Sequence, residues 1–186
     1  AEEQVSELVG LVARRLDDRL AGELGFLVVI AQVSGQNGSD WAKLPIGEPE
    51  GVSMGVLPHN GNAIVGVSLS ASEWPGIVRS FQGHPAVCYN KGQGLLFTVP
   101  VYNGPNIKYV LYRRYSEQSM LKAFHMQFFA GQGHALLQTQ NGYLHLTDVD
   151  WSDKDMEYLR RLEAVRVLNT LKTELYSSTS AAIYDG

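Results

Sequence analysis

Apolar residues recur every three or four positions over the first part of the chain. This spacing predicts one amphipathic helix over residues 1–33, with acidic residues near its start, as the helix dipole favours. Its apolar stripe consists of seven residues: Val5, Leu8, Val12, Leu16, Leu20, Leu24 and Leu27. Gly22 and Gly25 weaken the middle of the pattern, so a kink is compatible with it. We expect the stripe to lie on the domain or on a twin helix in a homodimer.

The next segment, residues 34–62, differs in character because Gly, Pro, Asn, Ser and Asp dominate it. It predicts a long surface loop with room for one short strand, and a loop of this length is usually functional or mobile. The alternating pattern of Asn62–Leu69 predicts a strand. Ser70, followed three residues later by Glu73, forms a capping box, which predicts a short helix that runs toward Phe81.

The strongest β pattern lies in the middle of the chain. The runs Leu95–Tyr102 and Ile107–Tyr115 are rich in Val, Leu, Phe and Tyr, and Asn103-Gly104-Pro105 joins them. Such runs around an Asn-Gly turn predict an antiparallel hairpin. Pro85–Asn90 predicts a further strand before it.

The last third of the chain predicts a second set of helices and strands. Ser116 caps a predicted helix that ends at Gly131. Residues 134–147 predict another tight hairpin, residues 152–176 a long helix with an apolar stripe, and residues 180–184 one more strand.

The central segment Lys91–Tyr115, KGQGLLFTVPVYNGPNIKYVLYRRY, resembles the middle hairpin of the Cache sensors. These are PAS-like extracytoplasmic domains of bacterial transmembrane receptors. The resemblance implies an α+β fold: a long N-terminal helix packed on a PAS-like antiparallel sheet, then a second PAS-like α/β segment. The three segments are residues 1–33, the sensor module 34–130, and the second module 131–186, which we expect to be truncated because the family has further strands after it.

The resemblance also implies a function. In such domains the hairpin forms the floor of a small-molecule pocket, and ligand binding shifts a two-state equilibrium that is passed across the membrane. The output modules of such receptors are diguanylate cyclases, histidine kinases or chemotaxis modules. We therefore expect an extracytoplasmic sensor domain, periplasmic or extracellular, that has no catalytic residue, no metal and no cofactor.

The composition limits the classes of molecule that this chain could bind. A net charge of −4 over 186 residues argues against nucleic acid or an anionic membrane surface as a partner. The sequence has no apolar run of about 18 residues, so we expect membrane attachment only through flanking segments. The sole cysteine, Cys88, lies in an apolar strand and is expected to be a buried thiol.

Polar-tipped aromatic residues and arginines gather in the PAS-like module. The candidate ligand-binding residues are Trp74, Arg79, Tyr89, Tyr109 and Arg113. We expect them around a cavity between the central hairpin and the segment Trp74–Phe81, with an arginine gripping a carboxylate or a similar polar metabolite. The family's amino-acid-sensing motif, a tyrosine, an Arg-Trp-Tyr cluster and a later aspartate, is not found here, which argues against an amino-acid ligand.

Three other interpretations stay open. Gly51-Val52-Ser53-Met54-Gly55 matches the G-x-S-x-G pattern of serine hydrolases, but that motif needs a strand before Ser53 and a helix after it, and its flanks here contain Pro and Gly. A structural or dimerisation module without a ligand would use its helix stripes as the partner surface. His134 and His145 would supply two metal ligands if they faced each other across the second hairpin.

Overall fold

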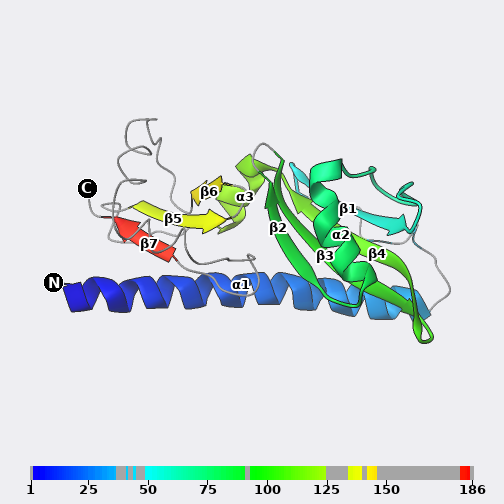
Figure 1. Ribbon diagram of the computed structural model, residues 1–186, viewed down its shortest axis with the longest axis horizontal. Coiled ribbons are helices and arrows are strands. Elements are labelled where there is room, and N and C mark those ends of the chain that lie inside the picture. Colours follow the sequence, from blue (N-terminus) through cyan, green and yellow to red (C-terminus); the bar gives the residue numbers. More distant parts are fainter. Residues whose placement is uncertain are drawn as a thin grey trace. The chain divides into compact units, whose positions relative to one another are not determined.

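The computed structural model describes residues 2–36, 41, 44, 49–90, 93–124, 134–139, 142–145 and 181–184 (Figure 1). The chain divides into two compact units. One unit, Arg19–Met120, holds a four-stranded sheet and is called the four-stranded unit. The other, Ala1–Asp18 with Leu121–Gly186, holds a three-stranded sheet.

The N-terminal helix is confirmed. Helix α1 runs over Glu2–Gln36 without a break at Gly22 or Gly25. The predicted stripe is buried where its side chains are described: Leu16, Leu20, Leu24 and Leu27, and Ala31 continues it. Among the described residues, no helix has the length and apolar character that crossing a membrane requires.

The central hairpin is confirmed as well. Strands β3 (Gly94–Asn103) and β4 (Asn106–Tyr115) are antiparallel neighbours at the centre of a sheet ordered β1-β4-β3-β2. Gly104 has a φ of 61°, a conformation that glycine adopts at low cost in such a turn. Strand β2 (Ala86–Asn90) pairs with β3 on one side, and β1 (Val52–Pro58) pairs with β4 on the other.

Strand β1 lies inside the segment predicted as a loop with room for one short strand, and its pairing with β4 fixes that strand at Val52–Pro58. One local prediction is corrected. The predicted strand Asn62–Leu69 is wrong: it makes one isolated bridge, Val65 with Val56. Gly66, with a φ of 82°, interrupts the extended backbone there.

The predicted capping box does mark the start of a helix. The Glu73 carboxylate accepts the Ser70 N–H at 2.9 Å, as a capping box requires. A 3₁₀ turn, η2 (Ala71–Glu73), leads into α2 (Trp74–Phe81).

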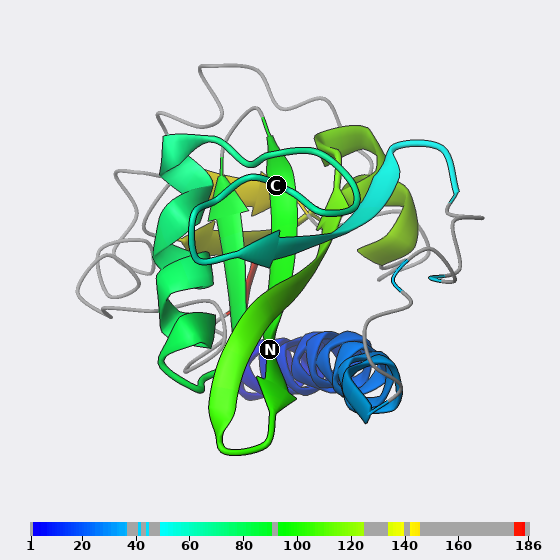
Figure 2. The same cartoon turned by 90° about the vertical axis from the view of Figure 1, so that its right-hand side faces the viewer.

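The four-stranded sheet has two differently covered faces (Figure 2). One face packs on α2 through six buried side chains, Leu57, Leu69, Ile77, Leu96, Val110 and Tyr112, with Ala63, Trp74 and Phe81 packed against them. We call it the α2 face. The other face meets the last turns of α1, where Gly35 approaches Val101. We call it the α1 face.

The remaining elements follow the sequence closely. Helix α3 spans Glu117–Phe124, and the second hairpin is β5 (His134–Thr139) with β6 (Gly142–His145). Strand β7 (Ala181–Tyr184) pairs with β5 in the order β6-β5-β7. His145 lies opposite Leu136 and not opposite His134, so the register does not support the alternative in which these two histidines face each other. The predicted helix 152–176 lies outside the described residues.

Candidate ligand-binding site

The loop between β1 and η2, residues 59–70, is fastened to the α2 face by one hydroxyl. Tyr112 donates its O–H to the carbonyl of Val67 at 2.7 Å and accepts the Val67 N–H at 2.9 Å. We call this pair of hydrogen bonds the Tyr112–Val67 clasp. Burial raises the pKa of Tyr112, and Glu73 adds to the rise, while the Val67 bond and Arg114 oppose it. The hydroxyl therefore stays protonated and can donate and accept at once.

Two glycines make the clasp sterically feasible. Gly55 lies opposite Tyr112 on the neighbouring strand, and a Cβ at Gly55 would meet the Tyr112 ring at 2.6 Å. A Cβ at Gly66 would meet the Tyr112 hydroxyl and the Met54 carbonyl, each at 2.7 Å. The ring thus crosses β1 over Gly55 to reach the loop. This packing accounts for the second glycine of the G-x-S-x-G pattern.

A charged pair borders the same loop. Glu73 is 1% exposed, and its carboxylate accepts from the Ser70 hydroxyl at 2.8 Å and from Arg114 Nη1 at 3.2 Å. Gln93 Oε1 accepts from the Ser72 hydroxyl at 2.9 Å. Burial of this carboxylate is tolerated because it is both ion-paired and hydrogen-bonded.

Two of the five predicted residues lie on α2. Trp74 contacts the loop, since a Cβ at Gly61 would meet its ring at 2.7 Å. Arg79 lies near Cys88, whose pKa is raised by burial, with the charge of Arg79 acting in the opposite direction. Five positions separate Trp74 from Arg79, which puts them about 140° apart around the helix. The neutral, half-buried Cys88 thiol agrees with the predicted structural role.

The other three lie on the opposite face of the sheet. Arg113 donates to Glu23 of α1 at 2.7 Å and lies over the rings of Phe26 and Tyr115. Tyr109 meets the edge of Trp41 at a centroid distance of 5.7 Å. These contacts belong to the α1 face.

Tyr89 also serves a structural contact. Its hydroxyl donates to Glu117 Oε1 of α3 at 3.1 Å, and burial raises its pKa, with the Glu117 charge and hydrogen bond adding to the effect. The five predicted residues therefore do not converge on one cavity. The predicted space between the hairpin and Trp74–Phe81 is occupied by the side chains of the α2-face core.

Sequence reasoning missed the residues that hold the loop. Tyr112 and Arg114 follow Leu111 and Arg113 by one position each, so strand alternation places them on the α2 face. The alternation separated the two sets correctly but did not show which face the loop covers. Glu73 was identified only as a helix cap.

The pattern around Ser53 lacks the geometry of a nucleophile elbow. Ser53 lies within β1, which pairs in register with β4 and continues extended to Pro58, so no helix follows the serine. Gly51, with a φ of 76°, approaches Ser116 and Ser119 at the start of α3. In the described part of the chain, no group of three or more His, Cys, Asp or Glu residues is arranged to hold a metal ion.

Comparisons with known proteins identify the fold. No protein-family profile matches the sequence, and no curated protein matches it. The ligand-binding domain of the amino acid chemoreceptor PctB of Pseudomonas aeruginosa PAO1, solved with L-Arg, superposes with a TM-score of 0.60 at 16% identity, covering 83% of this chain and 72% of that one. The same domain with L-Gln gives 0.59 at 19% identity, covering 96% and 81%.

A third structure extends the likeness to another species. The ligand-binding domain of chemoreceptor CtaA of Pseudomonas fluorescens, solved with L-serine, gives a TM-score of 0.56 at 14% identity, covering 80% of this chain and 72% of that one. The likeness spans the long helix and the antiparallel sheet, as the resemblance of the central hairpin predicted. The chain therefore has the α+β, Cache-type fold of chemoreceptor ligand-binding domains.

Proposed function

We propose that this chain is the ligand-sensing domain of an extracytoplasmic receptor, and that it binds a small polar metabolite. The fold shared with two chemoreceptor domains, seen in three structures that each hold a bound amino acid, carries this proposal. Because that likeness is one of fold, the site must be argued from this chain's own residues.

The binding site we propose lies under the loop 59–70, at the border between the loop, α2 and the sheet. Two backbone hydrogen bonds from one hydroxyl hold Val67 down, so releasing it costs far less than moving a packed helix. The closed loop and an open loop then form the two states whose populations a ligand shifts. In the closed state the α2-face core fills the space below.

The ligand chemistry follows from the charges at this border. Trp74 and Arg79 belong to α2. Arg114, which pairs with Glu73, would stay at this border when the loop opens. An arginine fork binds a carboxylate through two parallel hydrogen bonds. The Glu73 carboxylate beside it suits an amine or hydroxyl on the same ligand. We therefore propose a small carboxylate that also carries a donor group.

A thermal-shift screen tests the function. L-arginine, L-glutamine and L-serine, together with organic acids such as succinate and citrate, are added at increasing concentration. A ligand raises the melting temperature by an amount that grows with its concentration. We expect Arg79→Ala or Arg114→Gln to diminish that rise.

Variants on the other face provide the control. Tyr89, Tyr109 and Arg113 remain sequence predictions for ligand contact, and Tyr89→Phe, Tyr109→Phe and Arg113→Ala test them. We expect these three variants to lower the melting temperature of the free protein but to keep the ligand-induced rise. A screen in which no compound raises the melting temperature would favour a ligand-free structural module instead.

The wider receptor architecture is part of the same proposal. Flanking segments would anchor the domain outside the cytoplasm and lead to an output module, and residues 131–186 would form a second PAS-like module.

Phe26, Val29 and Val33 lie on one stripe of α1 and are 49–57% exposed. We propose that a second copy of the chain covers them. Sedimentation of the wild type and Val29→Glu tests this, since only the wild type should dimerise.

A further inference from the structure

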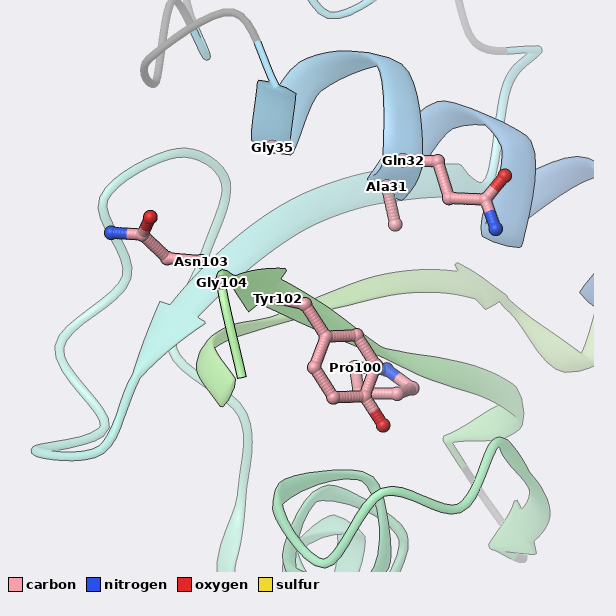
Figure 3. A pocket seen from close by; sticks show the side chains of 7 residues that line it. All are labelled: Ala31, Gln32, Gly35, Pro100, Tyr102, Asn103 and Gly104. Carbon is pink, nitrogen blue, oxygen red and sulfur yellow. The ribbon is translucent and has the colours of Figure 1, made fainter. Parts of the chain in front are cut away.

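A cleft lies at the tip of the central hairpin, where the end of β3 meets the last turns of α1. Strand β2 pairs with β3 only as far as Thr98, so the end of β3 continues beyond its neighbour. The last turns of α1 pack against this end of β3, where a Cβ at Gly35 would lie 3.0 Å from the Tyr102 carbonyl oxygen. Gln32 and Gly35 of α1, with Tyr102 and Asn103 of β3, line a cavity of about 360 Å³ (Figure 3). That volume falls in the range of small-molecule sites, roughly 300–1,000 Å³.

A smaller cavity adjoins the first. It measures about 60 Å³ and shares Gly35, Tyr102 and Asn103 with it. Trp41 and Tyr109 also line it. Because the two cavities share lining residues, we treat them as one cleft at the hairpin tip.

One buried donor in this cleft has no acceptor. Trp41 is 3% exposed, and its indole N–H finds no hydrogen-bond partner among the described residues. Leaving such a donor unpaired costs about 1–3 kcal/mol. Buried polar groups that stay unpaired in a folded protein call for a functional explanation. Here a ligand that offers an oxygen at the inner end of the cleft would satisfy it.

From these features we infer that the cleft is a binding site for a neutral, polyhydroxylated ligand the size of a monosaccharide. Gln32 and Asn103 each carry an amide that both donates and accepts, which matches hydroxyl groups that do the same. Tyr102 is 48% exposed and offers a ring face for the apolar side of such a ligand.

The charges argue against an anion. Among the side chains that line the two cavities, only that of Lys108 is charged, and its ammonium lies over the Tyr109 ring, 5.3 Å from the centroid. The last carbonyls of α1 point toward this end of the helix and carry partial negative charge. A carboxylate would be repelled by the partial negative charge of these carbonyls. Its only cationic neighbour among the lining residues, Lys108, already contacts the Tyr109 ring. A neutral ligand avoids both costs, and the site does not depend on the function proposed above.

Nuclear magnetic resonance of the indole N–H groups tests the site directly. The chain has three tryptophans, and Trp74→Phe and Trp151→Phe assign the remaining signal to Trp41. D-glucose, D-galactose, D-ribose and myo-inositol serve as probes, with acetate and succinate as charged controls. We expect at least one of the neutral probes to move the Trp41 signal, and Gln32→Ala or Tyr102→Ala to weaken that affinity about tenfold.

Three outcomes would overturn the inference. The first is a Trp41 signal that responds to none of the neutral probes. The second is an equal response in wild type, Gln32→Ala and Tyr102→Ala, which would locate binding elsewhere. The third is a signal that acetate or succinate moves in wild type but not in Lys108→Gln, which would make the cleft an anion site.

Discussion

Arg113 and Arg114 are neighbours on β4, yet each is paired with an acid from a different part of the chain. Arg113 reaches Glu23 of α1, 90 positions away, whereas Arg114 reaches Glu73 at the start of α2, 41 positions away. Glu73 is buried and Glu23 is a quarter exposed. The two faces of one sheet thus bury charge to different extents.

The faces also differ in what covers them. The part of α1 that belongs to the four-stranded unit, from Arg19 onward, covers the α1 face. A short helix and a loop cover the α2 face, and the Tyr112–Val67 clasp holds that loop. Local opening is cheapest where few buried contacts and few hydrogen bonds hold a segment. Local opening should therefore cost less on the α2 face than on the α1 face.

The largest expected effect comes from blocking the path of the Tyr112 ring. Gly55→Ala places a methyl group 2.6 Å from that ring, and the clasp prevents the ring from moving away. We expect a loss of about 3 kcal/mol in the free energy of unfolding. Urea denaturation measures it.

Gly22→Ala is the matched control for this substitution. A Cβ there would have no atom within 4 Å, and the residue lies inside α1. We expect it to stabilise the protein by about 0.5–1 kcal/mol, since alanine favours a helix over glycine. If the two substitutions had similar effects, the packing of Tyr112 across β1 would be wrong.

The two ion pairs allow a matched comparison. Glu73→Gln should cost about 2 kcal/mol, because Glu73 is buried and supports both the helix cap and Arg114. Glu23→Gln should cost about 1 kcal/mol, because its pair with Arg113 is partly exposed.

Salt separates the two ion pairs further. Added sodium chloride should reduce the cost of Glu23→Gln more than that of Glu73→Gln, since exposed pairs are screened more strongly. Denaturation at low and high salt measures this difference. A larger cost for Glu23→Gln at both salt concentrations would reverse our comparison of the two faces.

Removing the hydroxyl alone isolates the clasp. Tyr112→Phe keeps the ring but loses both hydrogen bonds to Val67, and we expect it to cost about 1.5 kcal/mol. The Val67 amide should exchange with solvent faster than in the wild type. Tyr102→Phe, at the exposed hairpin tip, should change neither quantity. An unchanged exchange rate at Val67 in Tyr112→Phe would show that the clasp does not hold the loop.

The smallest effect appears only at alkaline pH. Tyr89 and Tyr112 both have pKa values raised above the ordinary 10.0 by burial. The stability this provides is present below about pH 10 and is lost as the pH rises through the pKa of the folded state. Ultraviolet titration of phenolate should therefore show later ionisation in the wild type than in the urea-unfolded chain. Each of Tyr89→Phe and Tyr112→Phe should remove part of that delay.

The elements that were predicted correctly are those whose formation depends on residues close together in the sequence. The central hairpin was predicted because two β-rich runs and an Asn-Gly turn lie within 25 residues, and α1 because its stripe repeats over many turns. The sequence allowed one short strand within residues 34–62, but only the pairing of β1 with β4, some 55 residues later, places it at Val52–Pro58. Strand alternation correctly predicted that Arg113 and Arg114 lie on opposite faces of the sheet. Their partners depend on which helix covers which face, and the sequence pattern does not contain that information.

The central claim is that a ligand acts on the loop 59–70. Hydrogen–deuterium exchange tests it most directly, with and without the compound that gives the largest thermal shift among L-arginine, L-glutamine, L-serine, succinate and citrate. We expect the compound to change exchange mainly in residues 59–70 and in α2. Exchange that is unchanged there, or that changes only along α1 and the hairpin tip, would contradict it.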